Sequence, residues 1–175
     1  VGGVSSIAPA LPLMVKELNV KPGQIGLLIT VFTLPGMVLT PITGILADRY
    51  GRKTILVPSL ILFGIAGFLC TFTRTFEILI VLRFIQGLGA ASLGAMNVTL
   101  IGDIFSGNQR AAAMGYNSGI LSIGTASYPV IGGSLAMAGW YYPFILPLLA
   151  IPVGLLVLFR LKNPEPEAPP SMKQY

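Results

Sequence analysis

The sequence predicts an all-α membrane protein, built as a bundle of six transmembrane helices. Hydrophobic residues make up 54% of the 175 positions and charged residues only 10%, and the mean hydropathy is +0.82. A soluble domain carries about 25% charged residues, so the few present here could not cover a water-facing exterior. Long apolar runs are separated by short polar stretches, which indicates that lipid surrounds most of the chain.

Charge and residue usage exclude several other classes. The net charge of +5 comes from basic residues in short loops rather than on one face, so membrane topology explains it better than nucleic-acid binding. The single cysteine, Cys70, has no partner for a disulfide or a thiolate metal site. There is no histidine, no nucleophile beside a base and no phosphate-binding glycine loop. We therefore expect neither an enzyme nor a bound metal or cofactor.

The first two helices differ in length. Residues 1–14 are apolar but fall short of the roughly 20 residues that a span requires, so we interpret them as the outer part of a first helix that lacks its beginning. A polar loop is expected at 16–23 and a second helix at 24–46. Pro35 and Pro41 lie inside that helix, where membrane helices tolerate proline if neighbouring groups satisfy the freed carbonyls.

Short turns separate the remaining helices. The helices are expected at 54–71, 76–100, 110–136 and 141–161, with turns at 73–75, 103–109 and 138–139. Residues 1–160 would thus form one transmembrane domain, and residues 161–175, rich in proline and glutamate, a cytoplasmic linker or tail.

The distribution of basic residues predicts the orientation. Seven lie on the side that holds the turn between the second and third helices, and three lie on the other: Arg49, Arg52, Lys53, Arg110, Arg160, Lys162 and Lys173 against Lys16, Lys21 and Arg74. Because positive residues favour the cytoplasmic side, that turn and both chain ends should be cytoplasmic. We expect a multi-pass protein of a prokaryotic inner membrane.

The turn between the second and third helices carries a dense polar motif. It reads Gly-Ile-Leu-Ala-Asp-Arg-Tyr-Gly-Arg-Lys-Thr-Ile-Leu over residues 44–56, with its key positions at Gly44, Asp48, Arg49, Gly51, Arg52 and Lys53. We expect a tight hairpin in which Gly51 adopts a positive φ. The motif closely resembles the loop signature of major facilitator superfamily transporters, and that resemblance implies half of their fold: two three-helix units related by inverted topology.

A second motif lies in the fourth predicted helix. Arg83 falls about 10 Å below the outer helix end, where a guanidinium is costly unless it has a partner. Polar and small residues continue the same stripe at Gln86, Gly87, Ala90, Gly94 and Asn97. Arg83 could face a functional cavity or could serve as a hydrogen-bonding post for neighbouring backbone. Residues 80–91 resemble the fourth-helix signature of the same superfamily, which implies a candidate role for Arg83 in proton coupling.

The fifth predicted helix is rich in small residues. Gly115, Gly119 and Gly124 precede Tyr128, Pro129, Gly132 and Gly133. Small residues at four-residue spacing permit close backbone approach between membrane helices. The pattern resembles the motif of exporters in the superfamily, of the drug-efflux type, except that Tyr128 stands where glycine is usual. A tightly packed helix with no bearing on transport direction is the alternative.

The charged residues at the cytoplasmic helix ends suggest a gate. By resemblance, Asp48, Arg52 and Asp103 would form a latch that closes the cytoplasmic side, with Arg49 and Arg110 within reach. A local salt bridge without gating is the alternative, and such exposed pairs contribute only about 0–1 kcal/mol.

These observations predict the N-terminal half of a secondary transporter that exports small, lipophilic solutes by rocking around a midplane cavity, with proton coupling as a further possibility. The cavity would be lined by seven polar residues: Arg83, Gln86, Asn97, Thr30, Thr33, Asn117 and Tyr128. Their polarity would require a partner half, either a C-terminal domain or another copy. The alternative function is a non-transporting membrane module that binds or regulates such a half.

Overall fold

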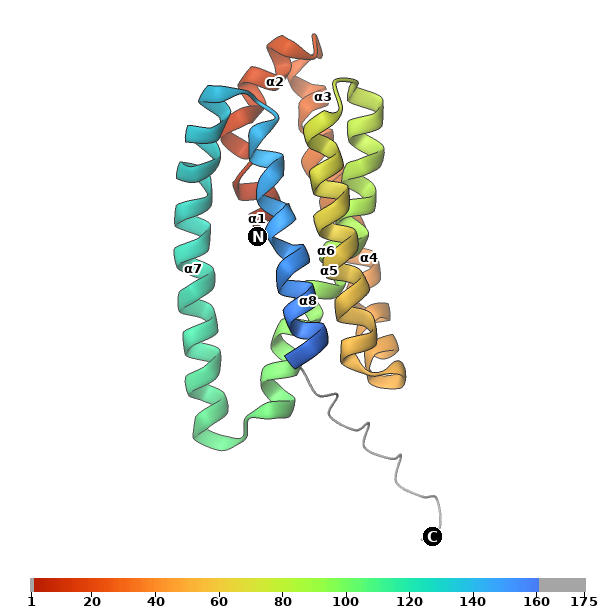
Figure 1. The fold of residues 1–175 in the computed structure, drawn as a ribbon, viewed down its shortest axis with the longest axis vertical. Coiled ribbons are helices and arrows are strands. Elements are labelled where there is room, and N and C mark those ends of the chain that lie inside the picture. The colour runs from red at the N-terminus through yellow and green to blue at the C-terminus, as the bar shows by residue number, and fades with distance from the viewer. Residues whose placement is uncertain (1, 161–175) are drawn as a thin grey trace, which may run out of the picture.

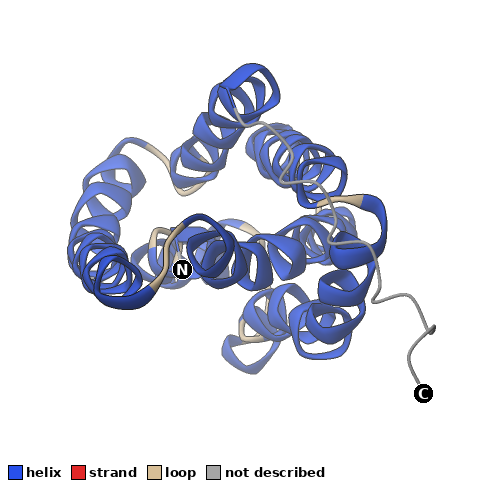
Figure 2. Cartoon of the chain, turned by 90° about the horizontal axis from the view of Figure 1, so that it is seen from below, coloured by secondary structure: helices blue, strands red, loops and turns tan. Residues whose placement is uncertain are grey.

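The computed structural model describes residues 2–160, which are helical apart from short turns (Figures 1 and 2). The elements in chain order are α1 (Gly2–Ser5), η1 (Ala8–Ala10), α2 (Leu11–Glu17), α3 (Pro22–Ile25), α4 (Leu27–Tyr50), α5 (Arg52–Phe72), α6 (Phe76–Ile104), α7 (Gly107–Ala138), η2 (Tyr142–Leu149) and α8 (Ala150–Arg160). The predicted all-helical, six-helix architecture is confirmed. The predicted tail at 161–175 lies outside the described residues.

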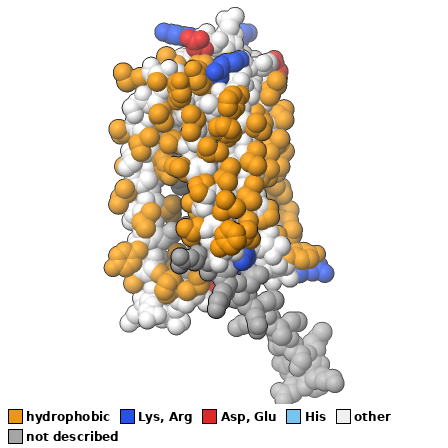
Figure 3. Space-filling view, in the orientation of Figure 1, with side chains coloured by type: hydrophobic (Ala, Val, Ile, Leu, Met, Phe, Trp, Pro, Cys, Tyr) orange, Lys and Arg blue, Asp and Glu red, His pale blue; other side chains and the backbone are white. Residues whose placement is uncertain are grey.

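Five segments of the described chain are long and apolar enough to cross a membrane. They are Pro22–Tyr50, Arg52–Phe72, Phe76–Ile104, Gly107–Ala138 and Tyr142–Phe159. The segment from α1 to α2 is shorter and is not among them. Hydrophobic side chains cover the flank of the bundle while charged ones gather at its two ends (Figure 3). This distribution is that of a protein whose sides contact lipid.

The turn after the second span is shorter than predicted. α4 continues through Asp48 and Arg49 to Tyr50, and α5 begins at Arg52, so Gly51 alone connects them. Its φ of 90° confirms the expected positive φ. The predicted helix end at residue 46 was wrong because it followed the loss of hydrophobicity, whereas backbone hydrogen bonding continues beyond the apolar run through Ala47, Asp48 and Arg49, of which alanine and arginine are good helix formers.

The turn between α6 and α7 is also shorter than predicted. α6 runs to Ile104 and therefore includes Asp103, so the expected loop at 103–109 is reduced to Phe105 and Ser106, followed by Gly107 with a φ of 52°. The sixth span differs as well, because it begins as a 3-10 helix and becomes α-helical only at Ala150. Pro147, inside this stretch, lacks the backbone N–H that an α-helix needs, which accounts for the irregular start.

The helices pack unequally. α4 and α5 lie against α6, and η2 and α8 lie against α5. α7 stands apart from this group over most of its length (Figure 1), and only Gly132 and Ala136 along it are buried. The largest apolar cluster joins α2, α5, α6 and η2 at the end away from Gly51, and it includes Met14, Cys70, Leu79 and Phe144. The core therefore fixes that end of the bundle most firmly.

Candidate functional site

Arg83 lies inside the bundle on α6. Its side chain is only 2% exposed. Nη1 donates hydrogen bonds to the Gly3 backbone carbonyl at 3.0 Å and to Gln86 Oε1 at 2.8 Å. Gln86 is one helical turn further along the same face, so the stripe predicted from the sequence places both groups together. The carbonyl of Gly3 comes from the start of the chain, so Arg83 ties the first segment to α6.

Two aromatic rings flank the guanidinium. The Cζ atom of Arg83 lies 4.6 Å from the ring centroid of Phe144 and 5.4 Å from that of Phe32. Cation–π contacts of this kind contribute most where the cation is desolvated. Sequence reasoning missed both rings, because they come from α4 and η2 and nothing in their local patterns distinguishes them from lipid-facing phenylalanines. The arginine is thus stabilised by neutral groups, and none of the ion pairs found in the described residues includes it.

Gln86 is fully buried, and its Nε2 group has no hydrogen-bond partner in the described structure. A Cβ added at Gly67 would lie 2.6 Å from Nε2, so the glycine makes room for the amide. The cavity beside Arg83 has a volume of about 10 Å³ and is bordered by Gly3 and Phe32. This is roughly the space of one water molecule. A solute could reach Arg83 only if the first segment moved.

The other predicted cavity residues occupy separate places. Asn97 Nδ2 donates to Asn117 Oδ1 at 3.0 Å, which links α6 to α7. Thr30 and Thr33 are exposed on α4, and each hydroxyl donates to a carbonyl one turn earlier in its own helix. Tyr128 borders an apolar pocket of about 250 Å³ between α5, α7 and the last span. The Thr33 hydroxyl also donates to the Thr30 carbonyl at 3.1 Å. The structure thus places the seven residues as three neighbouring pairs and the separate Tyr128, rather than along one surface.

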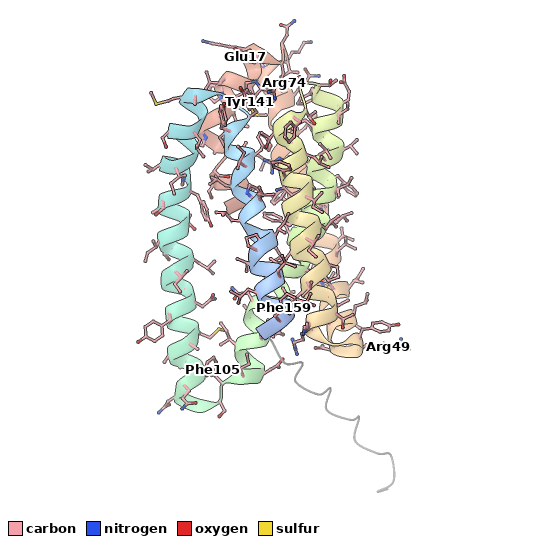
Figure 4. All side chains as sticks on the ribbon, viewed as in Figure 1. Glu17, Arg49, Arg74, Phe105, Tyr141 and Phe159 are labelled. Atoms are coloured by element: carbon pink, nitrogen blue, oxygen red, sulfur yellow. The ribbon has the colours of Figure 1, made fainter. Side chains whose placement is uncertain are left out.

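The charged residues at the Gly51 end meet around one arginine. Arg52 pairs with Asp48 at 2.9 Å, one turn back across the Gly51 connection, and also with Asp103 at the end of α6. Its side chain is 16% exposed. Arg49 lies at this end of the bundle (Figure 4), with its guanidinium 5.7 Å from the Tyr50 ring. Arg110 lies over Gly102 instead of joining these ion pairs. Arg52 therefore forms ion pairs with both aspartates of the predicted trio, Asp48 and Asp103.

The glycines of α7 differ sharply in what they contact. A Cβ at Gly132 would collide with the backbone carbonyl of Ser6, whereas one at Gly133 would meet only Pro9 at 3.6 Å. Gly115 and Gly119 have no atom of another segment within 4 Å of that position. Gly124 faces Tyr128 of its own helix, 3.2 Å away. Close backbone approach is thus confined to the end of α7 near Gly132.

These features define a class of protein. An apolar flank, charged ends and a buried arginine held at a helix crossing are typical of a polytopic membrane protein that handles solutes rather than a covalent catalyst. Residues 1–174 match the Major Facilitator Superfamily. The chain belongs to that superfamily of transporters, which confirms the resemblance seen in the two sequence motifs.

Two curated relatives are exporters or resistance proteins of bacterial membranes. The bacillibactin exporter of Bacillus subtilis (strain 168) is 34% identical over 149 residues, which cover 81% of this chain and 37% of that protein. The quinolone resistance protein NorA of Staphylococcus aureus (strain Mu50 / ATCC 700699) is 34% identical over 142 residues, with the same shares covered. The chain thus spans little more than a third of the length of these relatives, and it is a multi-span membrane protein related to efflux transporters.

Proposed function

We propose that this chain is the N-terminal half of an exporter of small organic solutes. The observation that carries the proposal is the Arg83 network, which joins the first segment, α4, α6 and η2 through one buried cation. Burying a guanidinium without a counter-ion costs several kcal/mol, so a protein keeps one where the position has a use. The relatedness to two proteins named for export and drug resistance supports outward movement of the solute.

The substrate class follows from the surroundings of this cation. The pocket at Tyr128 is apolar, and the arginine next to the first segment can attract an anionic group once that segment shifts. Solutes with a lipophilic body and a carboxylate or other acidic group would satisfy both. The two relatives are named for bacillibactin and for quinolones, so we propose organic molecules of this size rather than inorganic ions.

Alternating access would use the ion pairs of Arg52. We propose that the Gly51 end is cytoplasmic, in a prokaryotic inner membrane, and that Arg52 holds α4, α5 and α6 together while that side is closed. The Asp48 carboxylate is 63% exposed, and an ion pair with such an exposed partner is worth about 0–1 kcal/mol, so it can be broken and remade during a transport cycle. A second six-helix half, either a C-terminal domain or another copy, would supply the opposite wall of the pathway.

Two measurements test this proposal. Light scattering of the purified chain in detergent gives its oligomeric state, and the oligomer is then reconstituted into proteoliposomes, alone or joined to the C-terminal half of the quinolone resistance relative. Uptake or release of a fluorescent quinolone is followed with and without an imposed pH gradient. We expect movement that depends on protein, with an effect of the gradient if protons are coupled.

Variants at Arg83 connect the transport to the site. Arg83→Gln should abolish movement while Arg83→Lys, which keeps the charge but loses the planar fork, should retain part of it. Lys21→Gln, an exposed change at the end of the chain's first loop, serves as the control. Transport by Arg83→Gln at the unmodified rate would contradict the proposed role. Binding of a second half without any solute movement would instead favour a regulatory module.

A further inference from the structure

A separate pocket lies at the end of the bundle opposite Gly51. It has a volume of about 570 Å³ and lies between α2, the turn after α5 and the turn after α7. Its lining combines two charged residues, two aromatic ones and two exposed apolar ones: Glu17, Arg74, Trp140, Tyr141, Leu13 and Met137. Glu17, Arg74 and Tyr141 lie together at this end in Figure 4. Volumes of this size are typical of small-molecule and headgroup sites.

Arg74 is held in place on one side and available on the other. Its Cζ atom lies 3.8 Å from the ring centroid of Tyr141 and 5.5 Å from that of Trp140. Nη1 donates to the Thr71 carbonyl at 2.8 Å. The hydrogen bonds of Arg74 in the described structure all leave from Nη1, so the donors on Nε and Nη2 remain free for an anionic group. The rings of Trp140 and Tyr141 hold the guanidinium in one orientation, which reduces the entropy cost of binding an anion.

Glu17 supplies the opposite charge without neutralising Arg74. Both side chains line the same pocket, yet the ion pairs of the described residues do not include either one. A carboxylate and a guanidinium that share a pocket but remain apart can each bind one end of a zwitterion. An anion alone would leave Glu17 facing it, and an organic cation would meet Arg74. Charge complementarity therefore favours a ligand that carries both signs.

We propose that this pocket binds the headgroup of a phospholipid with a primary ammonium group, of the phosphatidylethanolamine type. The phosphate would accept hydrogen bonds from Arg74, the ammonium would donate to Glu17, and the acyl chains would descend over Leu13 and Met137, which are 39% and 88% exposed. Tryptophan and tyrosine gather at the headgroup level of membranes, which places this pocket at the right depth. The inference is independent of the proposed transport activity.

Native mass spectrometry of the whole chain in detergent tests the assignment. Equal amounts of dioleoyl phosphatidylethanolamine, phosphatidylcholine and phosphatidylglycerol are added, and the retained lipid is counted. Phosphatidylcholine has no N–H donor on its cationic group, and phosphatidylglycerol has no cation. We expect about a threefold to fivefold preference for the ethanolamine lipid over phosphatidylglycerol, the size that one exposed ion pair provides. The preference over phosphatidylcholine should be smaller, because that lipid keeps the positive charge and lacks only the hydrogen bond.

Matched variants test the ammonium contact and the phosphate contact of the headgroup separately. Glu17→Gln should reduce retention of the ethanolamine lipid to that of the other two, whereas Glu77→Gln, an exposed change near the same end, should leave the preference intact. Arg74→Gln should lower retention of all three lipids. If Arg74→Gln does not fold, Arg74→Lys replaces it and should weaken all three while preserving their order.

Three results would overturn the proposal. Equal retention of the three lipids by the unmodified chain would show that the pocket does not select a headgroup. A preference that survives Glu17→Gln would remove the ammonium contact. Displacement of the lipid by an equal concentration of glycerophosphoethanolamine would show a site for a free solute rather than a lipid.

Discussion

Replacing Gly132 by alanine should loosen the bundle, whereas the same change at Gly133 should not. Gly132 lies where α7 touches the backbone of the first segment, and an added Cβ would collide with the Ser6 carbonyl. Backbone cannot rotate away as a side chain can, so α7 or the first segment must shift. At Gly133 the added Cβ would lie 3.6 Å from Pro9, an ordinary van der Waals contact.

The size of the effect follows from two opposing terms. Alanine favours a helix over glycine by about 0.8–1.0 kcal/mol at either position. Overpacking costs about 1–3 kcal/mol, and it applies at Gly132 alone. We therefore expect Gly132→Ala to reduce the free energy of unfolding by up to about 2 kcal/mol, and Gly133→Ala to leave it unchanged or raise it by up to about 1 kcal/mol.

Cys70 provides the assay. It is the only cysteine of the chain and is 0% exposed, in the same apolar cluster as Ile7 and Ala136, which flank the Gly132 contact. A thiol-reactive fluorophore in detergent thus labels it only when the cluster opens. A loss of 2 kcal/mol corresponds to roughly 30-fold faster labelling. Equal labelling rates for the two alanine variants would refute the argument that the Gly132 contact is the close one.

Three further predictions use the same labelling assay. Gly51→Ala should destabilise the chain by about 1–2 kcal/mol, because an L side chain is strained at a φ of 90°. Gly44→Ala, with open space around the added methyl group, should be neutral or stabilising. A greater loss of stability in Gly44→Ala than in Gly51→Ala would contradict this. A double-mutant cycle of Asn97→Ala and Asn117→Ala should give a coupling free energy of about 0.6 kcal/mol, the average for hydrogen bonds between membrane helices. If the two losses of stability simply add, the hydrogen bond between the two side chains does not form in detergent. Arg52→Gln should cost under about 1 kcal/mol, and the cost should shrink as salt is added, since partly exposed ion pairs are screened. A large, salt-independent loss would show that these ion pairs are shielded from solvent.

The sequence predicted what depends on composition and local pattern. Helix number followed from hydropathy, and the placement of Arg83 and Gln86 on one face of α6 followed from their spacing. The positive φ of Gly51 followed from its place between two charged clusters. Helix ends were misplaced because hydrophobicity stops before hydrogen bonding does, as α4 shows by continuing through Asp48 to Tyr50.

Contacts between distant segments could not be predicted. Nothing local to Phe144 indicates that η2 brings its ring against Arg83, and nothing in the α7 glycines distinguishes Gly132 from Gly119. Likewise, Arg74 lies against the rings of Trp140 and Tyr141, which follow α7 and are far from Arg74 in the sequence. Each of these contacts depends on how the helices are placed relative to one another, and no short stretch of the sequence predicts that placement.

The exposed polar residues of α7 carry a different meaning once their hydrogen bonds are known. Polarity facing lipid would by itself require a covering partner, because unsatisfied donors are costly in hydrocarbon. In α7, however, the hydroxyls of Ser122, Thr125 and Ser134 each donate to a carbonyl of their own helix. These three hydroxyls can therefore face lipid or a second helix at little difference in hydrogen bonding. The proposal of a second half thus gains no support from these hydroxyls, and its support is the greater length of the exporters to which the chain is related.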